Sequence, residues 1–271
     1  MLKDITLGQY YPGNSIVHRI DPRIKILLVL IYIVALFFVK NFCGFAVYAV
    51  ITLGIIFLSS LPLGYVLKGV RPLLFIIVFT AVLNLFMTPG KIWVQIPYTP
   101  LTITYEGAKT AVLLIVRLIF LITGTSLLTL TTSPLSLTDG IERLLSPLRK
   151  IGVPAHELAM MMSIAIRFIP TLLEETEKIM KAQTARGADF ESGNLLRRAK
   201  ALIPLLVPLF ISAFRRADDL AMAMECRCYN GGNRRTRMKV LKLGLKDLYA
   251  SLICIPLLFG AAVIGMLPFL I

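Results

Sequence analysis

The chain has 271 residues, of which 57% are hydrophobic and only 16% charged, and its formal net charge is +14. A mean hydropathy of +0.80 is too high for a soluble globular domain, so the composition indicates an integral membrane protein. The basic surplus lacks interleaved aromatic residues, which argues against nucleic-acid binding and favours a cytoplasmic surface near anionic lipid.

Residues 1–25 are expected to remain in the mature protein. They contain Asp4, Pro12, Asp21 and Pro22 among scattered basic residues. A cleavable signal peptide instead has a short basic end followed directly by an apolar core. The first apolar helix is therefore predicted to be a permanent membrane span.

Five segments approach the roughly 20 apolar residues that a spanning helix needs. They are residues 24–42, 44–61, 72–88, 107–130 and 248–271. Only a short turn separates the first two, which predicts a tight helical hairpin. The whole pattern predicts an all-α, polytopic membrane protein with about five spans.

Charges in the short loops predict the orientation. Lys3, Arg19, Arg23 and Lys25 precede the first span and Lys68 and Arg71 follow the second, whereas the opposite side carries only Lys40 and Lys91. The positive-inside rule therefore predicts a cytoplasmic N-terminus. The loop at residues 88–106, which contains Trp93, Tyr98 and Tyr105, is expected to form an interfacial turn outside the cell.

A charged insert follows the fourth span and is predicted to be cytoplasmic. It contains 19 of the 29 basic and 11 of the 15 acidic residues. The expected domains are a membrane domain at residues 1–131, a cytoplasmic domain at residues 132–246 and a last span at residues 247–271. Helix stop and start signals divide the insert into three helices, at residues 134–150, 154–186 and 194–227.

The two long helices of the insert share one design, apolar near the start and charged towards the end. The first carries apolar residues at helical spacing, namely Leu158, Met161, Met162, Ala165, Ile169, Leu172 and Leu173. The second is apolar on all sides over residues 202–214. About 13 residues are too few to cross a bilayer, so a buried or interfacial helix is predicted there.

Each long helix is predicted to end in an arginine between small residues. The first end is Ala185, Arg186 and Gly187, and the second is Cys226, Arg227 and Cys228. An arginine at a helix C-terminus is favourable in itself, because the helix end carries a partial negative charge. The repetition also fits paired docking knobs, because small neighbours let a partner approach the directional guanidinium.

The sequence predicts neither catalytic residues nor a metal site nor a cofactor held by this chain. It contains no Gly-x4-Gly-Lys-Ser/Thr loop, no Gly-x-Ser-x-Gly elbow and no His-Glu-x-x-His pair. Its four cysteines and two histidines lack the spacing of zinc ligands, and the cysteines are interpreted as small core residues. Lys109 and Arg117 are charged residues within a span, for which snorkelling and helix packing are the structural alternatives to a functional role.

Several motifs together resemble the transmembrane T component of energy-coupling factor transporters. They are residues 18–25 (HRIDPRIK), 152–154 (GVP), 167–170 (RFIP), 182–190 (AQTARGADF), 215–218 (RRAD) and Arg227, followed by Gly231, Gly232, Arg235, Thr236 and Arg237. The resemblance extends over nearly the whole chain. The second arginine end departs from the family's usual Ala-Arg-Gly, because Cys226 and Cys228 replace its neighbours.

The resemblance implies a non-catalytic coupling subunit in the plasma membrane of a prokaryote. Its implied partners are two ABC-type ATPases, which bind ATP and Mg, and a membrane S component that binds a vitamin or metal ion. The long helices would cross, and the ends at Arg186 and Arg227 would dock on the ATPases. The implied platform for the S component is Leu158, Met161, Met162, Ala165, Ile169, Leu202, Leu206, Phe210 and Phe214.

Two other classes remain as alternatives. A secondary transporter or channel with its own substrate predicts intramembrane acids and broken, repeated helices, which the sequence lacks. A membrane scaffold without a transport role would differ from a coupling subunit in having no ATPase partner. The sequence does not identify the solute, and it does not indicate whether one S component or several use this chain.

Overall fold

The computed structural model describes residues 10–95, 102–190, 194–231 and 243–266. The chain forms two compact units. The membrane unit comprises Gln9–Gly140 and Leu241–Ile271, and the long-helix unit comprises Ile141–Val240 together with Met1–Gly8. Each unit has its own packing and is described separately.

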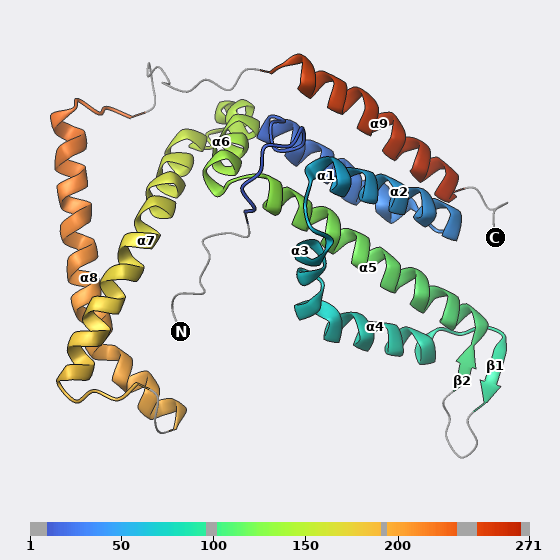
Figure 1. Cartoon of the computed structure of the whole chain (residues 1–271), viewed down its shortest axis with the longest axis horizontal. Coiled ribbons are helices and arrows are strands. Elements are labelled where there is room, and N and C mark those ends of the chain that lie inside the picture. The colour runs from blue at the N-terminus through green and yellow to red at the C-terminus, as the bar shows by residue number, and fades with distance from the viewer. Residues whose placement is uncertain (1–9, 96–101, 191–193, 232–242, 267–271) are drawn as a thin grey trace. The chain divides into compact units, whose positions relative to one another are not determined.

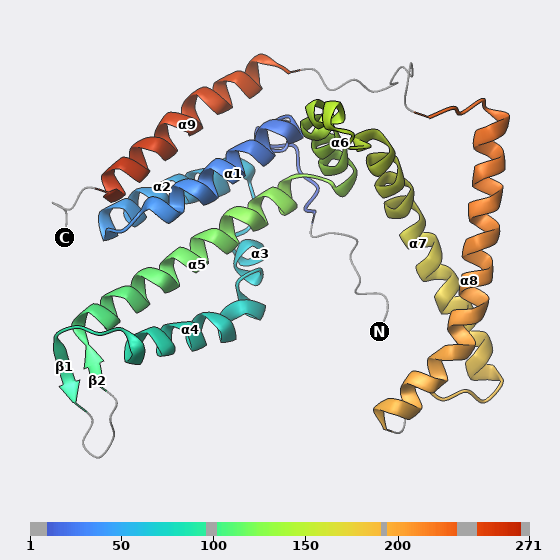
Figure 2. The ribbon, with the colours of Figure 1, turned by 180° about the vertical axis from the view of Figure 1, so that it is seen from behind.

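The membrane unit is helical with one short β-ribbon (Figure 1). Its elements are α1 (Pro22–Phe38), α2 (Phe42–Ser59), α3 (Leu63–Lys68), a 3-10 turn (Arg71–Leu73), α4 (Leu74–Met87), β1 (Ile92–Gln95), β2 (Thr102–Thr104), α5 (Tyr105–Thr131), the start of α6 (Pro134–Leu145) and α9 (Leu245–Met266). Helix α5 packs against α1, α2, α3 and α4, and α9 packs against α1 and α2. Figure 2 shows the same arrangement from behind. The all-α prediction is confirmed, and the ribbon is an addition to it.

Five helical segments among the described residues are long and apolar enough to cross a membrane. They are Phe42–Ser59, Leu63–Met87, Tyr105–Thr131, Ala155–Ala185 and Leu245–Met266. Four agree with predicted spans, but the fifth is α7 rather than α1. Helix α1 has only 17 residues, about 26 Å against a hydrocarbon core of about 30 Å. Its packing between α5 and α9 nevertheless places it inside the membrane unit.

The expected turn at residues 88–106 contains the antiparallel pair of β1 and β2. Its ends are fixed to the neighbouring helices, since the Thr104 hydroxyl donates to the carbonyl of Thr88 at 2.8 Å and the Lys91 N–H donates to Glu106 at 2.7 Å. The side chains of Trp93 and Tyr98 lie outside the described residues. The placement of this loop outside the cell stays a prediction.

The core of the membrane unit lies where α1, α2, α5 and α9 meet. Tyr32 and Tyr48 are buried there with ring centroids 5.3 Å apart, and the Tyr32 hydroxyl contacts the Thr52 hydroxyl at 3.1 Å. A Cβ on Gly44 would clash with the Cα of Gly265 at 2.8 Å, and a Cβ on Gly265 would clash with the Cα of Val39 at 2.9 Å. These glycines allow the short α1–α2 turn to contact the end of α9, and the predicted hairpin closes there.

Buried charges join the other ends of three helices. Asp21, Lys25 and Asp247 are each only 6% exposed. Asp247 accepts the Asp21 N–H at 2.7 Å, and the Lys25 ammonium donates to the Thr131 carbonyl at 3.0 Å. The starts of α1 and α9 and the end of α5 therefore lie on the same side of the membrane unit. This agrees with the alternation of the predicted spans, and which side faces the cytoplasm stays a prediction.

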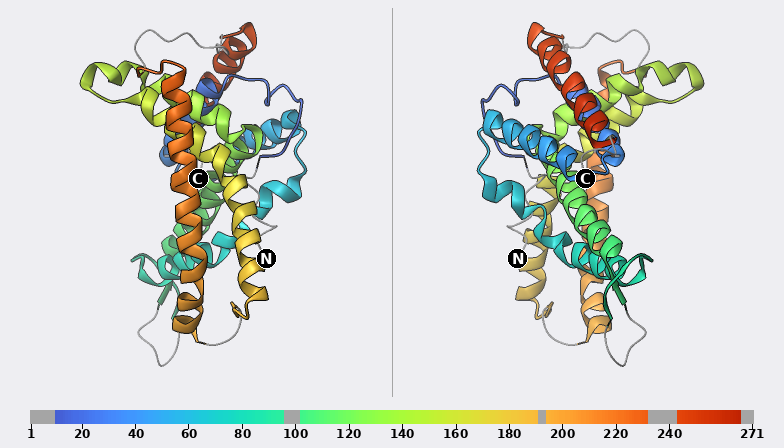
Figure 3. Two further views of the ribbon diagram at one scale, coloured as in Figure 1. Left: turned by 90° about the vertical axis from the view of Figure 1, so that its left-hand side faces the viewer. Right: turned by 90° about the vertical axis from the view of Figure 1, so that its right-hand side faces the viewer.

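The long-helix unit contains the end of α6, a 3-10 turn (Ser146–Ile151), α7 (Ala155–Ala185) and α8 (Leu195–Cys226). Helices α7 and α8 pack against each other. Their upper ends diverge in Figure 1 and their lower ends diverge in the left view of Figure 3, so the two helices cross. Helix α8 contains Pro204 and Pro208, and it bends along its length in Figures 1 and 2. A proline removes one helical hydrogen bond and crowds the preceding turn, which accounts for a bend at this place.

Candidate functional site

A polar contact joins α7 and α8 about two-thirds of the way along each helix. One carboxylate oxygen of Glu175 accepts a hydrogen bond from the Ser212 hydroxyl at 2.6 Å, and the other accepts one from the Arg216 guanidinium at 2.5 Å. The Arg216 Nε lies 3.5 Å from the same hydroxyl. We call these three residues the crossing cluster. It fixes the register of the two helices, because Ser212 and Arg216 on α8 both bind the carboxylate of Glu175 on α7.

Both long helices end in the same backbone structure. At the end of α7 the N–H of Gly187 donates to Thr184 and that of Ala188 donates to Gln183. At the end of α8 the N–H of Cys228 donates to Glu225 and that of Tyr229 donates to Met224. These bond pairs define a Schellman motif at each end. Arg186 and Arg227 are the C-cap residues of the two motifs, so the repeated sequence pattern is a repeated structure.

The two ends differ at the residue after the arginine. Gly187 has φ +91° and Cys228 has φ +56°, so both adopt the left-handed conformation that closes a Schellman motif. Glycine adopts it freely, whereas a residue with a Cβ loses roughly 1–2 kcal/mol. Cys228 is thus the strained counterpart of Gly187.

Replacing Cys228 with glycine is expected to stabilise the end of α8 by roughly 1 kcal/mol, because the Cβ strain is relieved. Thermal unfolding of the purified chain with and without the substitution measures this effect. Gly187→Ala serves as the opposite change and is expected to destabilise the end of α7 by a similar amount. A lower unfolding temperature for Cys228→Gly would contradict the account.

The arginine ends are accessible. All six residues of the two ends are exposed, namely Ala185, Arg186, Gly187, Cys226, Arg227 and Cys228. Neither guanidinium pairs with a carboxylate within the described part of the chain. Both are therefore available to a partner molecule, in addition to their favourable position at a helix C-terminus.

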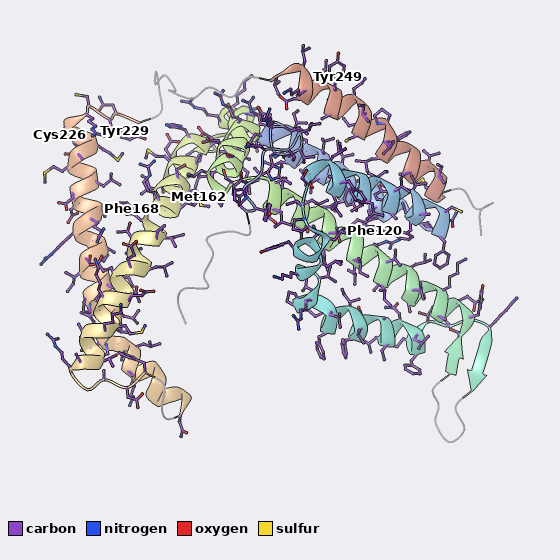
Figure 4. The ribbon with its side chains drawn as sticks, viewed as in Figure 1. Phe120, Met162, Phe168, Cys226, Tyr229 and Tyr249 are labelled. Carbon is purple, nitrogen blue, oxygen red and sulfur yellow. The ribbon has the colours of Figure 1, made fainter. Side chains whose placement is uncertain are left out.

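The two ends lie symmetrically about the crossing cluster. Glu175 precedes Arg186 by 11 residues, and Arg216 precedes Arg227 by 11 residues. At 1.5 Å per residue each end is roughly 16 Å from the cluster along its own helix. The two helices run in opposite directions, so their C-terminal ends point away from each other. Figure 4 labels Cys226 and Tyr229 at the C-terminal end of α8. Any partners that hold both ends must contact two separate places.

The residues predicted to form the platform are exposed on α7 and α8. Leu158, Met161, Met162, Ala165, Ile169, Leu202, Leu206, Phe210 and Phe214 are all exposed. Phe210 and Phe214 are 59% and 67% exposed. Contiguous exposed apolar surface of this kind marks contact with a protein or a membrane. Its assignment to an S component stays a prediction.

A cleft between α7 and α8 separates the crossing cluster from the end of α8. A cavity of about 450 Å³ is lined by Phe168 and Ala217. A second cavity of about 670 Å³ extends to Arg167 and Arg227. Met162 and Phe168 lie on α7 in Figure 4. Arg167 belongs to one of the sequence motifs, and the structure places it in the same cleft as the predicted docking residue Arg227.

The structure gives a packing role to one of the two charged residues within the fourth span, Arg117. The Arg117 guanidinium donates to the carbonyl of Val39 at 2.6 Å and lies 6.0 Å from the ring centroids of Phe37 and Phe45. Arg117 thus binds the α1–α2 turn to α5, which is the packing role given as its structural alternative. Lys109 is half-buried, and its role stays open.

The described residues contain no group of three or more His, Cys, Asp or Glu side chains that could hold a metal ion. The four thiols are free, and Cys43, Cys226 and Cys228 are exposed, so the prediction that the cysteines are small core residues is wrong for these three. Gly232, Arg235, Thr236 and Arg237, which belong to the last motif, lie outside the described residues. The arginine ends and the apolar faces of α7 and α8 are the exposed surfaces that the sequence predicts to be contact sites.

Comparison with known proteins finds relatives over most of the chain. The family model CbiQ, described as cobalt transport protein, matches residues 13–239. A relative from Thermosediminibacter oceani is 61% identical over 249 residues, which are 92% of this chain and 93% of the relative. A relative from Clostridium kluyveri is 59% identical and covers 95% of this chain and 97% of the relative, and one from Bacillus subtilis is 47% identical and covers 91% and 93%. All three relatives are named energy-coupling factor transporter transmembrane protein EcfT.

Proposed function

We propose that this chain couples the motion of ATPases to solute uptake. The premise is that the chain belongs to the CbiQ family and, within it, to the energy-coupling factor transmembrane proteins EcfT. The chain is a transmembrane component of an energy-coupling factor transporter. Its proposed partners are two ABC-type ATPases, which hold ATP and Mg, and an S component that binds a vitamin or metal ion. The chain itself is proposed to be non-catalytic and to hold no cofactor.

The observation that supports this role is the repeated arginine end. Two helices with the same C-terminal motif present Arg186 and Arg227 at opposite ends of one packed pair. A pair of similar ATPases offers two similar receptor sites, which matches two similar ends. Guanidinium groups suit such sites because they form directional bonds to carboxylates and carbonyls.

The proposed mechanism is mechanical. When the ATPases close on ATP, the docked ends move with them, and α7 and α8 carry the displacement along their length. Helices can do this because their internal hydrogen bonds keep them stiff over tens of Å. The crossing cluster would make the two helices move as one body.

The exposed apolar faces of α7 and α8 are the proposed platform that contacts the S component. Leu158 and Met162 on α7 and Phe210 and Phe214 on α8 would contact the S component, which supplies specificity for the solute. Methionine suits a surface that accepts differing partners because its side chain is flexible and polarisable. In this proposal the long-helix unit lies on the cytoplasmic side of the plasma membrane, together with the N-terminus.

Purification of the chain from its native membrane tests the proposal. We expect two ATP-binding chains and one small membrane protein to co-purify, and the reconstituted set to import its solute only when ATP is hydrolysed. The isolated chain is expected neither to bind ATP nor to transport. Ion-driven uptake by the chain alone in liposomes would contradict the proposal and support a secondary transporter.

A further inference from the structure

An apolar cavity of about 380 Å³ lies in the membrane unit between α1, α2, α5 and α9. Aliphatic side chains line most of it, among them Leu28, Ile55 and Leu127. Its volume falls in the range of about 300–1,000 Å³ that is usual for small-molecule sites. Ile253 and Tyr249, the latter labelled at the start of α9 in Figure 4, also line the cavity and are exposed. The cavity is therefore accessible from the surface that surrounding lipid covers.

A smaller polar cavity of about 250 Å³ adjoins the apolar one. Ile20, Lys25 and Thr131 line both cavities. Hydroxyl groups of Thr132, Ser133 and Ser136 belong to the polar wall. Together the two cavities form an amphipathic site, apolar among the helices and polar at the end where α1 and α9 begin and α5 ends.

The polar cavity is lined by the cations Arg19 and Lys25 and the carboxylates Asp21 and Asp247, and Lys246 at the apolar cavity adds a third cation, so cations outnumber carboxylates by one. Its carboxylates, Asp21 and Asp247, are already engaged, because Asp21 accepts the Arg23 N–H at 2.9 Å and Asp247 accepts two backbone N–H groups. The ring of His18 bonds Ser15 and the carbonyl of Tyr11, and the Lys25 ammonium bonds three backbone or hydroxyl oxygens.

Two further cations remain available to a ligand. Arg19 lines the polar cavity, and Lys246 lines the apolar one. Both are exposed, and neither pairs with a carboxylate among the described residues. Each cation near anionic lipid is worth about 1 kcal/mol.

We propose that the two cavities hold one anionic phospholipid, with an acyl chain in the apolar cavity and its phosphate beside Arg19 and Lys246. A purely apolar helix surface has no group that can select a lipid headgroup. This site would select one, since cations and hydroxyls border one end of an apolar cavity. The lipid would join α1, α2, α5 and α9 at the end where the buried charges already join three of them.

Native mass spectrometry of the full chain in detergent, titrated with phosphatidylglycerol or phosphatidylcholine, tests the proposal. We expect one phosphatidylglycerol to be retained per chain, at least roughly tenfold more tightly than phosphatidylcholine, because two cations contribute. Lys246→Gln is expected to lower this preference roughly fivefold, because it removes one of the two cations. Lys40→Gln is the matched control, since Lys40 is equally exposed but lies beside Gly265, at the other end of α9.

A second variant tests the acyl chain separately. Ala250→Phe places a ring in the apolar cavity and is expected to reduce retention of both lipids, while the unfolding temperature identifies any loss of fold. Equal retention of the two lipids by the unaltered chain would overturn the proposal. A photocrosslinker at Ile253 that captured a polypeptide from the native membrane, instead of lipid, would also overturn it.

Discussion

Glutamate at both Arg186 and Arg227 is expected to abolish co-purification of the ATPases while the chain still inserts into the membrane. Each exposed guanidinium is the centre of a helix end whose neighbours are small, so each would be a dominant contact of its interface. Losing such a contact costs roughly 2 kcal/mol or more, and charge reversal adds repulsion from the acceptor groups. Pull-down of the ATPases with the tagged chain measures the loss.

Lys181→Glu with Lys200→Glu is the matched control for the double reversal. Both lysines are exposed, one on each long helix, and their reversal changes the net charge by the same amount. The control is expected to retain the ATPases. Equal retention by the arginine variant and the control would show that the ends are not docking points.

Glu175→Arg is expected to abolish ATP-driven uptake while the ATPases stay bound to the complex. The substitution puts a cation against Arg216 and removes the acceptor of the Ser212 hydroxyl, so the two helices lose their common register. The effect on stability is expected to be small, roughly 1 kcal/mol or less, because the pair is partly exposed. The effect on uptake is expected to be large, because motion has to pass this contact.

The exchanged pair Glu175→Arg with Arg216→Glu tests whether the ion pair itself matters. We expect it to restore uptake in part, measured in liposomes that contain the reconstituted complex. Glu174→Arg is the control, since Glu174 is exposed on the adjacent position of α7. Full uptake by Glu175→Arg alone, or no recovery in the exchanged pair, would contradict a coupling role for the crossing cluster.

The membrane helices could be predicted from sequence where apolar length alone decides. Helices α2, α5 and α9 have 18, 27 and 22 residues and are apolar over most of their length, and their starts agree with the prediction to within three residues. Helix α1 is only 17 residues long, and α7 reaches spanning length because its apolar half continues into a charged half. Length and composition cannot separate an interfacial helix from a crossing one in such cases.

The arginine ends were predictable because they are local in sequence. Helix stop signals at Gly187 and after Arg227 place each arginine at a C-cap, and the structure gives both the same motif. The crossing cluster was not predictable in this way. The meeting of Glu175 with Ser212 and Arg216 depends on the angle and register of two helices, which periodicity does not specify.

The buried end of the membrane unit shows the same limit. Asp21 and Asp247 are 226 positions apart, yet the Asp21 N–H donates to the Asp247 carboxylate. In sequence Asp247 looks like an ordinary acid at a helix start, and Lys25 looks like a loop cation that contributes to orientation. Only the packing of α1, α5 and α9 shows that these charges are buried and hydrogen-bonded.

Labelling of the native thiols beside Arg227 tests most directly whether the end of α8 docks on an ATPase, because the arginine itself is left unchanged. Cys226 and Cys228 flank Arg227 and are exposed, so a membrane-impermeant maleimide should modify them rapidly in the isolated chain, with Cys43 and Cys254 replaced by serine. An interface that excludes water also excludes the reagent. The account predicts strong protection of both thiols when the ATPases are bound, and unchanged labelling rates in the assembled transporter would contradict it.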